Sequence, residues 1–434
     1  MNNFTKFIQL HYYRSKPENE KDYSKSRSLF LYEGCAAMGI FTLTSGAFIA
    51  GYAKFLGASD TFNGIIGALP ALVAAIQIFG AMYFEKVERR KLVISVLALV
   101  HRFLFGCMFF IPFLTDNPVM RLVLLAAFYG LAHMIGAFIA SAAASWLVDL
   151  VPQFLRGKYF AARDASNLAF MTVMNIVLGY VLDVTRKQGN EFSGFLWIAA
   201  VVFILMLINF ILLSSVKEPL IKTSEERLQL KYILTQPFKE KDFRKVIWLF
   251  IFWNVSFQLA APFFAVYLVS GLQMDYTTIM VVGFIANVFR VIATPFWGKL
   301  ADKWGWAFTT KVSMGFLGTV HACWFFMDTT TAWWSFPVLS IASGIAWGSI
   351  GISLFNIQFV YAPKKDRTMY LSMASALGGI IGFASALISS FFVGIIGSHP
   401  IPIFAFTTSS MQWVFLVSGI LTVLTAYFVH KRIA

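Results

Sequence analysis

The chain has 434 residues and a formal net charge of +14, yet only 13% of its residues are charged and 58% are hydrophobic. About a quarter of the residues of a soluble globular domain are charged, so the composition argues against a soluble enzyme, a nucleic-acid-binding protein and a disordered chain. The mean hydropathy of +0.71 indicates instead a protein with several membrane-spanning segments.

The first 28 residues are polar and contain no apolar core followed by a cleavage site, so we expect a cytoplasmic tail rather than a signal peptide. Apolar segments then alternate with polar breaks, and each is long enough to cross a bilayer as a helix. The twelve predicted spans are 30–56, 61–83, 91–114, 119–147, 159–183, 193–215, 246–271, 277–300, 307–327, 333–360, 369–396 and 407–429.

The basic residues indicate the orientation of these spans. If the N-terminus is cytoplasmic, 29 of the 35 Lys and Arg residues fall on the cytoplasmic side and four on the outside. Because cytoplasmic loops are enriched in Lys and Arg, we expect both termini to be cytoplasmic, in an integral protein of a bacterial cytoplasmic membrane.

The polar segment 216–245 follows the sixth span and reads as a cytoplasmic linker that is partly helical over 225–234. The predicted domains are a tail (1–28), a six-helix bundle (29–215), the linker (216–245) and a second six-helix bundle (246–434). The three cysteines lie far apart in apolar stretches and predict neither disulfides nor a metal site. We expect no cofactor.

The two halves repeat each other. Pro152, Arg156 and Tyr159 follow the fourth span, and Pro363, Arg367 and Tyr370 follow the tenth span at the same spacing. Further matches at a similar separation, such as His101 with His321, indicate a duplicated six-helix unit.

The loop after the eighth span reads Gly-Lys-Leu-Ala-Asp-Lys-Trp-Gly and includes Gly298, Asp302, Lys303 and Gly305. It resembles the loop motif Gly-x-x-x-Asp-Arg/Lys-x-Gly-Arg-Arg/Lys of the major facilitator superfamily, although it lacks the basic end. The first-half copy around Glu85 keeps the acid and the basic end but has no glycines.

This resemblance covers about residues 29–430. It implies an all-α polytopic membrane protein with twelve transmembrane helices in two pseudo-symmetric bundles, a central cavity and alternating access. It also implies a conformational latch. Asp302 would meet the start of the fifth span near Arg156, and Glu85 the start of the eleventh near Arg367, because a helix N-terminus stabilises a carboxylate. The alternative is that these charges only fix orientation and form local pairs.

Two arginines, Arg102 and Arg290, lie near the middle of predicted spans, where an unpaired charge costs several kcal/mol. No acid lies at mid-span, so we expect neither arginine to have a carboxylate partner. A water-filled cavity that holds an anion is the simplest environment for Arg290, which shares a helical face with Asn287. The alternative is that Arg290 binds backbone carbonyls or side-chain amides. For Arg102 we favour a structural role.

Polar side chains in other spans complete the candidate substrate site. Asn254 and Gln258 lie four residues apart in the seventh span, Asn356 lies in the tenth, and His133 lies in the fourth. The resemblance implies that these spans line the cavity, whereas polar side chains in spans often only join helices.

Glu33 is the acid that comes nearest to the interior of a span and is a candidate coupling residue, together with Arg102. The alternative that we favour is an ion pair with a nearby Lys or Arg near the cytoplasmic face.

We therefore expect a monomeric secondary transporter, not an enzyme, that moves a small or amphipathic, anionic or zwitterionic solute by alternating access. A proton or another ion is its candidate coupling partner, and nucleic acid is not a partner. A proton-coupled multidrug-type exporter and a lipid flippase on the same fold are the alternatives.

Overall fold

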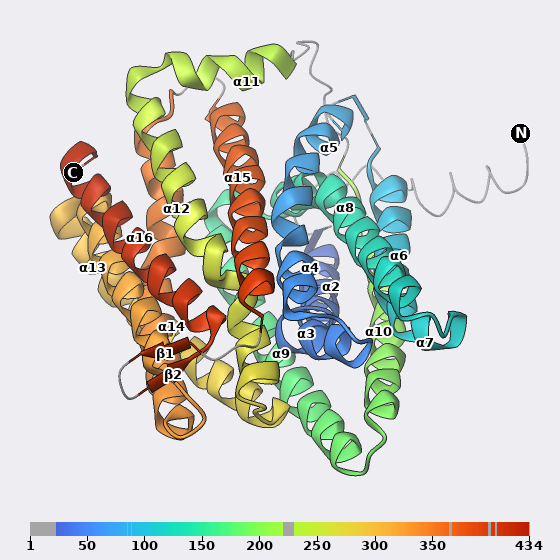
Figure 1. Cartoon of the computed structure of the whole chain (residues 1–434). Helices are drawn as coiled ribbons and strands as arrows, with labels where there is room; N and C mark the ends of the chain where they lie inside the picture. Colours follow the sequence, from blue (N-terminus) through green and yellow to red (C-terminus); the bar gives the residue numbers. More distant parts are fainter. Residues whose placement is uncertain are drawn as a thin grey trace, which may run out of the picture. The chain divides into compact units, whose positions relative to one another are not determined.

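The computed structural model describes residues 23–84, 86–87, 89–219, 230–363, 367–397, 401–403 and 406–433. Figure 1 shows that these residues are almost entirely helical. The helices are α2 (Ser24–Leu43), α3 (Gly46–Phe55), α4 (Asp60–Val73), α5 (Gln77–Phe84), α6 (Lys91–Cys107), α7 (Ile111–Leu114), α8 (Pro118–Leu150), α9 (Arg156–Lys187), α10 (Glu191–Ser215), α11 (Leu230–Lys239), α12 (Lys241–Val266), α13 (Tyr276–Cys323), α14 (Ala332–Tyr361), α15 (Arg367–Ile396) and α16 (Ser410–Arg432).

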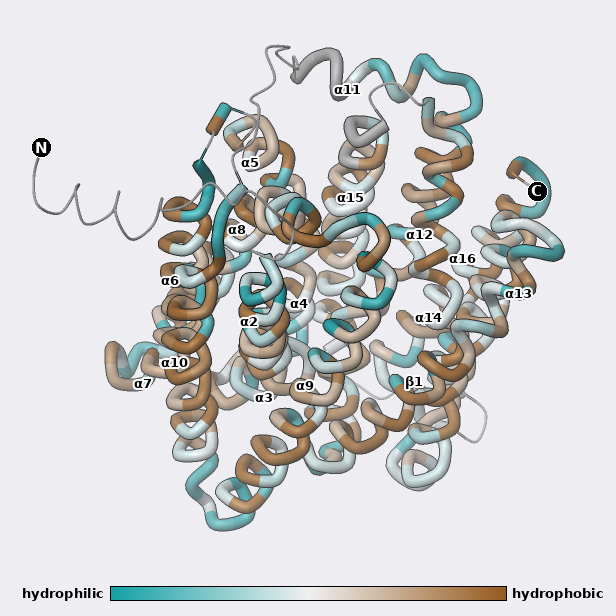
Figure 2. Tube along the Cα trace, turned by 180° about the vertical axis from the view of Figure 1, so that it is seen from behind, coloured by the Kyte–Doolittle hydropathy of each residue, from teal (hydrophilic) through white to brown (hydrophobic). Residues whose placement is uncertain are grey.

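Ten helical segments of the described chain are long and apolar enough to cross a membrane, and the bent pair α2–α3 is an eleventh candidate. Figure 2 shows long apolar runs along α6 and α10. α13 contains two predicted spans, 277–300 and 307–327, because its backbone leaves the helical region at Gly305, where φ is +82°. Counted in this way, the described helices account for the twelve predicted spans.

The first predicted span, 30–56, is interrupted. α2 ends at Leu43 and α3 begins at Gly46, with a bend of about 40° between them. The Thr44 hydroxyl donates to the carbonyl of Ile40 at 2.8 Å, and Gly46 has a φ of +56°, which glycine adopts more readily than other residues. The break therefore has a local cause in the sequence.

A short hairpin was not predicted. Strand β1 (Ile401–Ile403) pairs antiparallel with β2 (Phe406–Thr408) ahead of α16. The Trp413 indole of α16 donates a hydrogen bond to the Thr408 hydroxyl of β2 at 3.2 Å and so joins the hairpin to α16. The predicted span 407–429 therefore began too early, because 406–408 is extended and the helix begins with a capping box at Ser409.

The chain divides into two compact units. Unit 1 contains Met1–Leu56 and Ile76–Arg227, and unit 2 contains Gly57–Ala75 and Leu228–Ala434. In unit 1 the fully buried Trp146 of α8 packs edge-on against Phe30 of α2, with ring centroids 5.5 Å apart.

The predicted helix at 225–234 falls partly outside the described residues, and α11 begins at Leu230.

In unit 2, α4 packs against α12 and α15. Glycines allow this close approach. A Cβ atom at Gly67 would lie 3.0 Å from Cβ of Pro262, and one at Gly379 would lie 2.5 Å from the carbonyl oxygen of Ala71. Small residues at helix contacts are typical of membrane proteins, where close packing drives helix association.

The contact between α13 and α14 in unit 2 gives a first testable prediction. A Cβ atom at Gly344 would lie 2.2 Å from the backbone carbonyl oxygen of Ala286, whereas nothing lies within 4 Å of a Cβ at Gly351 on the same helix. Gly344→Ala is expected to lower stability by about 1–3 kcal/mol, the usual cost of overpacking. Gly351→Ala is expected to be neutral or slightly stabilising. Thermal unfolding of the two purified variants compares these sites, and equal melting temperatures would contradict the described α13–α14 contact.

Candidate functional site: a buried charge cluster in unit 1

A buried carboxylate in unit 1 is surrounded by donors from three other helices. Glu33 lies well inside α2 and is 6% exposed. Its Oε1 lies 3.4 Å from Nη2 of Arg102 on α6, and its Oε2 lies 3.7 Å from Nη2 of Arg163 on α9. The side-chain amide of Asn209 on α10 donates to Glu33 Oε1 at 3.0 Å and to the Glu33 carbonyl at 3.1 Å.

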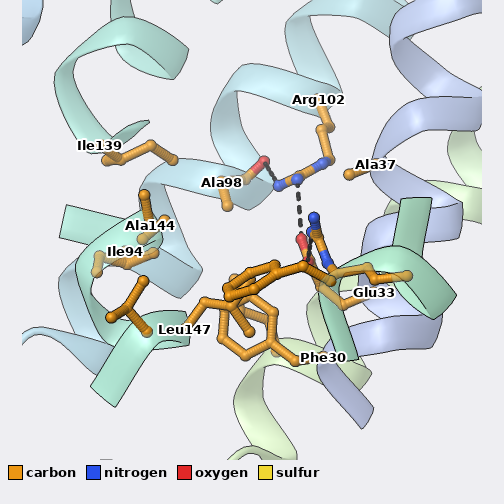
Figure 3. A pocket seen from close by; sticks show the side chains of 14 residues that line it. Phe30, Glu33, Ala37, Ile94, Ala98, Arg102, Ile139, Ala144 and Leu147 are labelled. Atoms are coloured by element: carbon orange, nitrogen blue, oxygen red, sulfur yellow. Dashed lines mark hydrogen bonds and ion pairs between the residues drawn. The ribbon is translucent and has the colours of Figure 1, made fainter. Parts of the chain in front are cut away.

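Arg102 is held in place by its own helix as well as by Glu33. Its Nη1 donates to the carbonyl of Ala98, one turn earlier, at 3.1 Å. In Figure 3 its guanidinium lies between the Ala98 carbonyl and the Glu33 carboxylate. The expectation that Arg102 has no carboxylate partner was therefore wrong. Glu33 lies deeper than predicted because α2 begins at Ser24, ahead of the predicted start at residue 30.

A cavity of about 360 Å³ adjoins this cluster. Its wall is mainly apolar and comes from α2, α6, α8, α9 and α10, with Glu33, Arg102 and Arg163 as its charged side chains (Figure 3). Ligand pockets usually enclose roughly 300–1,000 Å³ and combine apolar walls with a few polar groups. The cavity therefore has the size and the lining of a small-molecule site.

Glu33 and Arg102 were predicted from the sequence as candidate coupling residues, whereas Arg163 and Asn209 were not. Arg163 lies near the start of the predicted span 159–183, where its charge fits one of the basic residues of the cytoplasmic side. Asn209 lies inside the predicted span 193–215, where a polar amide among apolar residues marks it as a candidate.

Arg290 lies in unit 2, near the middle of the first part of α13, and is exposed on that unit. No hydrogen bond or ion pair joins its guanidinium to another residue in the described part of the chain. Thr294 uses its hydroxyl to bond the carbonyls of Arg290 and of Gly348 on α14, at 2.8 and 3.2 Å. Arg290 therefore keeps its donors available although it lies within an apolar helix.

The amide residues predicted for the substrate site are distributed over unit 2. The side-chain amides of Asn287, Asn254 and Asn356 each donate to a carbonyl one turn earlier on their own helix, at 2.8–3.0 Å. Asn254 and Gln258 face glycines of α15: a Cβ at Gly378 would lie 2.5 Å from Asn254, and one at Gly382 would lie 2.7 Å from Gln258. Among the described residues no hydrogen bond joins these amides to the Arg290 guanidinium, so their common site stays a prediction.

His133 belongs to an aromatic group in unit 1. Its ring lies 4.4 Å from that of Tyr129 and 5.0 Å from that of Phe105, between centroids. Its Nε2 is buried without a hydrogen-bond partner in the described structure. This packing favours a structural role over the predicted role in substrate binding.

The latch residues belong to different parts of the chain. Asp302 and Lys303 are exposed at the end of the first part of α13, where Gly298 has open space around it and Gly305 makes the bend. On unit 1, the Arg156 side chain donates to the carbonyl of Val151 at 3.1 Å. Glu85 and the side chain of Arg367 lie outside the described residues. The latch therefore stays a prediction.

The start of the linker carries another residue that the sequence analysis missed. Oε1 of Glu218 accepts hydrogen bonds from the backbone amides of Arg90 and of Lys91, the latter at 3.0 Å, and so caps the N-terminus of α6. The neighbouring Lys217 is tied to α2 and α8, because its amide donates to Ser26 Oγ at 3.0 Å and its carbonyl accepts from Trp146 at 3.1 Å. Hydrogen bonds thus join the segment after the sixth span to the helices of the first, third and fourth spans.

Burial raises the pKa of Glu218 above its ordinary value of 4.5, although the two backbone amides act in the opposite direction. An acid whose folded-state pKa is raised binds a proton more tightly when folded, so its contribution to stability falls as the pH rises from its ordinary pKa through the raised value. Glu218→Gln keeps an acceptor and loses this buried charge. We expect the variant to be at least as stable as the wild type at pH 7, because it buries no charge, and to lose this part of the pH dependence.

Glu218→Ala provides the comparison, because it removes the cap from both amides. A lost cap costs about 1 kcal/mol, so the alanine variant is expected to unfold at a lower temperature than the glutamine variant. Thermal unfolding between pH 4 and 8, which begins below the ordinary pKa of 4.5, measures both effects. Identical curves for the two variants would show that the cap has no energetic role.

The chain is related to known transporters in sequence pattern and in fold. The family model of the Major Facilitator Superfamily matches residues 29–386. No curated protein matches the sequence significantly.

Several solved structures resemble the chain over nearly its whole length. A variant of the nucleoside transporter NupG gives a TM-score of 0.69 at 12% identity, covering 95% of this chain and 100% of that one. A bacterial homologue of the iron transporter ferroportin, in an inward-facing state, gives 0.64 at 15% identity, covering 94% and 98%. A bacterial metal transporter gives 0.57 at 15% identity, covering 96% and 99%. At these identities the likeness shows the fold alone.

The family match and the fold agree with the twelve-helix architecture expected from the sequence. The matched region runs through both units and includes the loop motif at Gly298–Gly305, where α13 bends. The chain is an integral membrane protein that belongs to the Major Facilitator Superfamily of secondary transporters.

Proposed function

We propose that the protein transports a small anionic or zwitterionic solute by alternating access and that Arg290 binds the negative group of the solute. The observation that carries this proposal is the exposed guanidinium of Arg290, which has no partner among the described residues although it lies midway along an apolar helix. A charge at this depth is unfavourable in lipid by several kcal/mol unless it meets water or a counter-ion.

The guanidinium suits the negative group of a solute. Its planar fork donates two parallel hydrogen bonds to a carboxylate or phosphate, and it stays protonated at any physiological pH. A bound anion would satisfy these donors, and its release would return Arg290 to water. A reversible partner of this kind is what a transport cycle requires.

The rival role, a proton-coupled multidrug exporter of lipophilic cations, fits the described residues less well. Such a transporter uses a buried carboxylate to carry the proton. Glu33 is buried, but two arginines and Asn209 already engage it. The cytoplasmic position of both termini and the latch at Asp302 remain predictions that accompany the proposal.

A screen of paired solutes tests the proposed substrate class. The purified protein is incubated with small carboxylates and phosphates and with their neutral amide or alcohol analogues, and its thermal stability is measured. A ligand of the folded state raises the apparent stability. We expect stabilisation by members of the anionic set, not by their neutral analogues, and its loss in Arg290→Ala. Equal stabilisation of the Arg290→Ala variant and the wild type by every stabilising member of the anionic set would contradict the role of Arg290.

A further inference from the structure

The cavity of unit 1 carries more positive than negative charge. Glu33, Arg102 and Arg163 are its three charged lining residues, so the lining has one carboxylate for two guanidinium groups. Glu33 and Arg102 are both nearly excluded from solvent, with side chains 8% and 9% exposed. A buried excess charge is unfavourable unless it is paired. One further negative charge would balance the cluster.

Arg163 is the arginine with unused donors. Arg102 bonds both Ala98 and Glu33, whereas Arg163 makes no hydrogen bond with another described residue, and its nearest carboxylate oxygen lies 3.7 Å away. Its Nε is buried without a partner. A guanidinium carries five N–H donors, so most of its capacity at this site is unsatisfied.

The backbone of α2 leaves room for this guanidinium. A Cβ atom at Gly34 would lie 2.7 Å from Nη2 of Arg163, closer than real side chains approach. The glycine next to Glu33 therefore lets the arginine reach the cluster. Arg163 remains partly accessible, with a side chain 21% exposed, whereas Arg102 is enclosed.

The rest of the lining is apolar. Phe30, Ile94, Ile139, Leu147, Phe160 and Leu213 contribute side chains to it. Such a wall favours a hydrocarbon or aromatic body over a hydrated inorganic ion, because the wall cannot replace the hydrogen bonds that such an ion makes with water.

We propose that this cavity is a second binding site, specific for an amphipathic monoanion whose carboxylate pairs with Arg163 and whose compact apolar body contacts the wall around Phe30 and Leu147. Arg102 is a positioning residue, because it holds Glu33. The site goes beyond the proposed transport function, since it lies wholly within unit 1 and does not include Arg290. The ligand reaches the cavity either from water, as an aromatic acid, or from the membrane, as a fatty acid.

Calorimetry on the protein in lipid nanodiscs tests the site. The probes are phenylacetate, its neutral analogue phenylacetamide, laurate and inorganic phosphate, each corrected with empty nanodiscs. We expect phenylacetate or laurate to bind with saturation and phenylacetamide and phosphate to bind at least about tenfold more weakly, as the loss of a charged hydrogen bond implies. Binding of phenylacetate indicates a water-borne ligand, and binding of laurate alone indicates one drawn from the membrane.

Variants then separate the site from its surroundings. Arg163→Gln removes the charge and leaves Glu33 with Arg102, so we expect it to fold and to lose at least about tenfold in affinity. Ala143→Phe fills part of the cavity without changing a charge and is expected to abolish binding. Lys158→Gln, an exposed position on the same helix, is the control and is expected to bind like the wild type.

Two results would overturn the proposal: equal binding of phenylacetate and phenylacetamide, or unchanged affinity in both Arg163→Gln and Ala143→Phe. Arg290→Ala is measured in parallel and is expected to keep this binding. The failure of this site and the failure of the proposed transport site are thus distinguishable.

Discussion

Replacement of Glu33 by leucine is expected to lower the free energy of unfolding by about 3–5 kcal/mol, the usual effect of removing one partner from a buried ion pair. The change would leave the buried Arg102, 7% exposed, and the partly accessible Arg163 without their carboxylate. It would also remove the acceptor of Asn209 at 3.0 Å. The measurement is thermal unfolding of purified protein, monitored by the loss of the monodisperse peak in size-exclusion chromatography.

Two companion variants separate charge from packing. Glu33→Gln keeps an oxygen that accepts from Asn209 but removes the charge, so we expect an intermediate loss of stability. The double variant Glu33→Leu/Arg102→Leu removes both members of the closer pair, and its stability is expected to exceed that of Glu33→Leu alone. A melting temperature of Glu33→Leu equal to that of the wild type would show that the cluster does not stabilise unit 1.

Replacement of Arg290 by alanine is expected to reduce transport of an anionic solute by between about tenfold and about a hundredfold. A hydrogen bond between charged groups contributes about 1.5–3 kcal/mol, and each 1.4 kcal/mol corresponds to a factor of ten. Because the guanidinium makes no hydrogen bond or ion pair with the other described residues, its loss is expected to leave folding intact. The measurement is initial uptake into proteoliposomes, normalised to the protein that is correctly inserted.

The controls for Arg290 address charge and geometry. Arg290→Lys keeps the charge but loses the planar fork, so partial activity is expected. Arg244→Ala removes an exposed arginine at the start of α12 and is expected to transport like the wild type. Unchanged uptake by Arg290→Ala would remove this residue from the substrate site.

The helical architecture was predictable from the sequence because a bilayer imposes simple demands. Every backbone group must be bonded within the span, and each crossing needs about 20 apolar residues, so the spans are visible as apolar runs. The deviations have local causes that hydropathy does not report. Thr44 and Gly46 break the first span, and Ile401–Ile403 pairs with Phe406–Thr408 as two short strands.

The site was predictable only in part. Glu33 and Arg102 stood out one by one as charges inside apolar runs, but 69 positions separate them, and their pairing depends on the packing of α2 against α10 and of α10 against α6. Arg163 looked like one of many cytoplasmic charges. Glu218 looked like a linker residue, because no local pattern shows that it caps a helix more than a hundred residues earlier.

The central claim is that this chain carries a solute across the membrane by alternating access, and trans-acceleration tests it most directly. Proteoliposomes that contain the protein are preloaded with an anionic solute found in the stability screen, and uptake of the labelled solute from outside is followed. We expect saturable uptake that is faster into preloaded than into empty vesicles, because the carrier can then return to its outward-facing state with the preloaded solute bound. Uptake that does not saturate and that has the same rate into preloaded and empty vesicles would contradict a carrier mechanism.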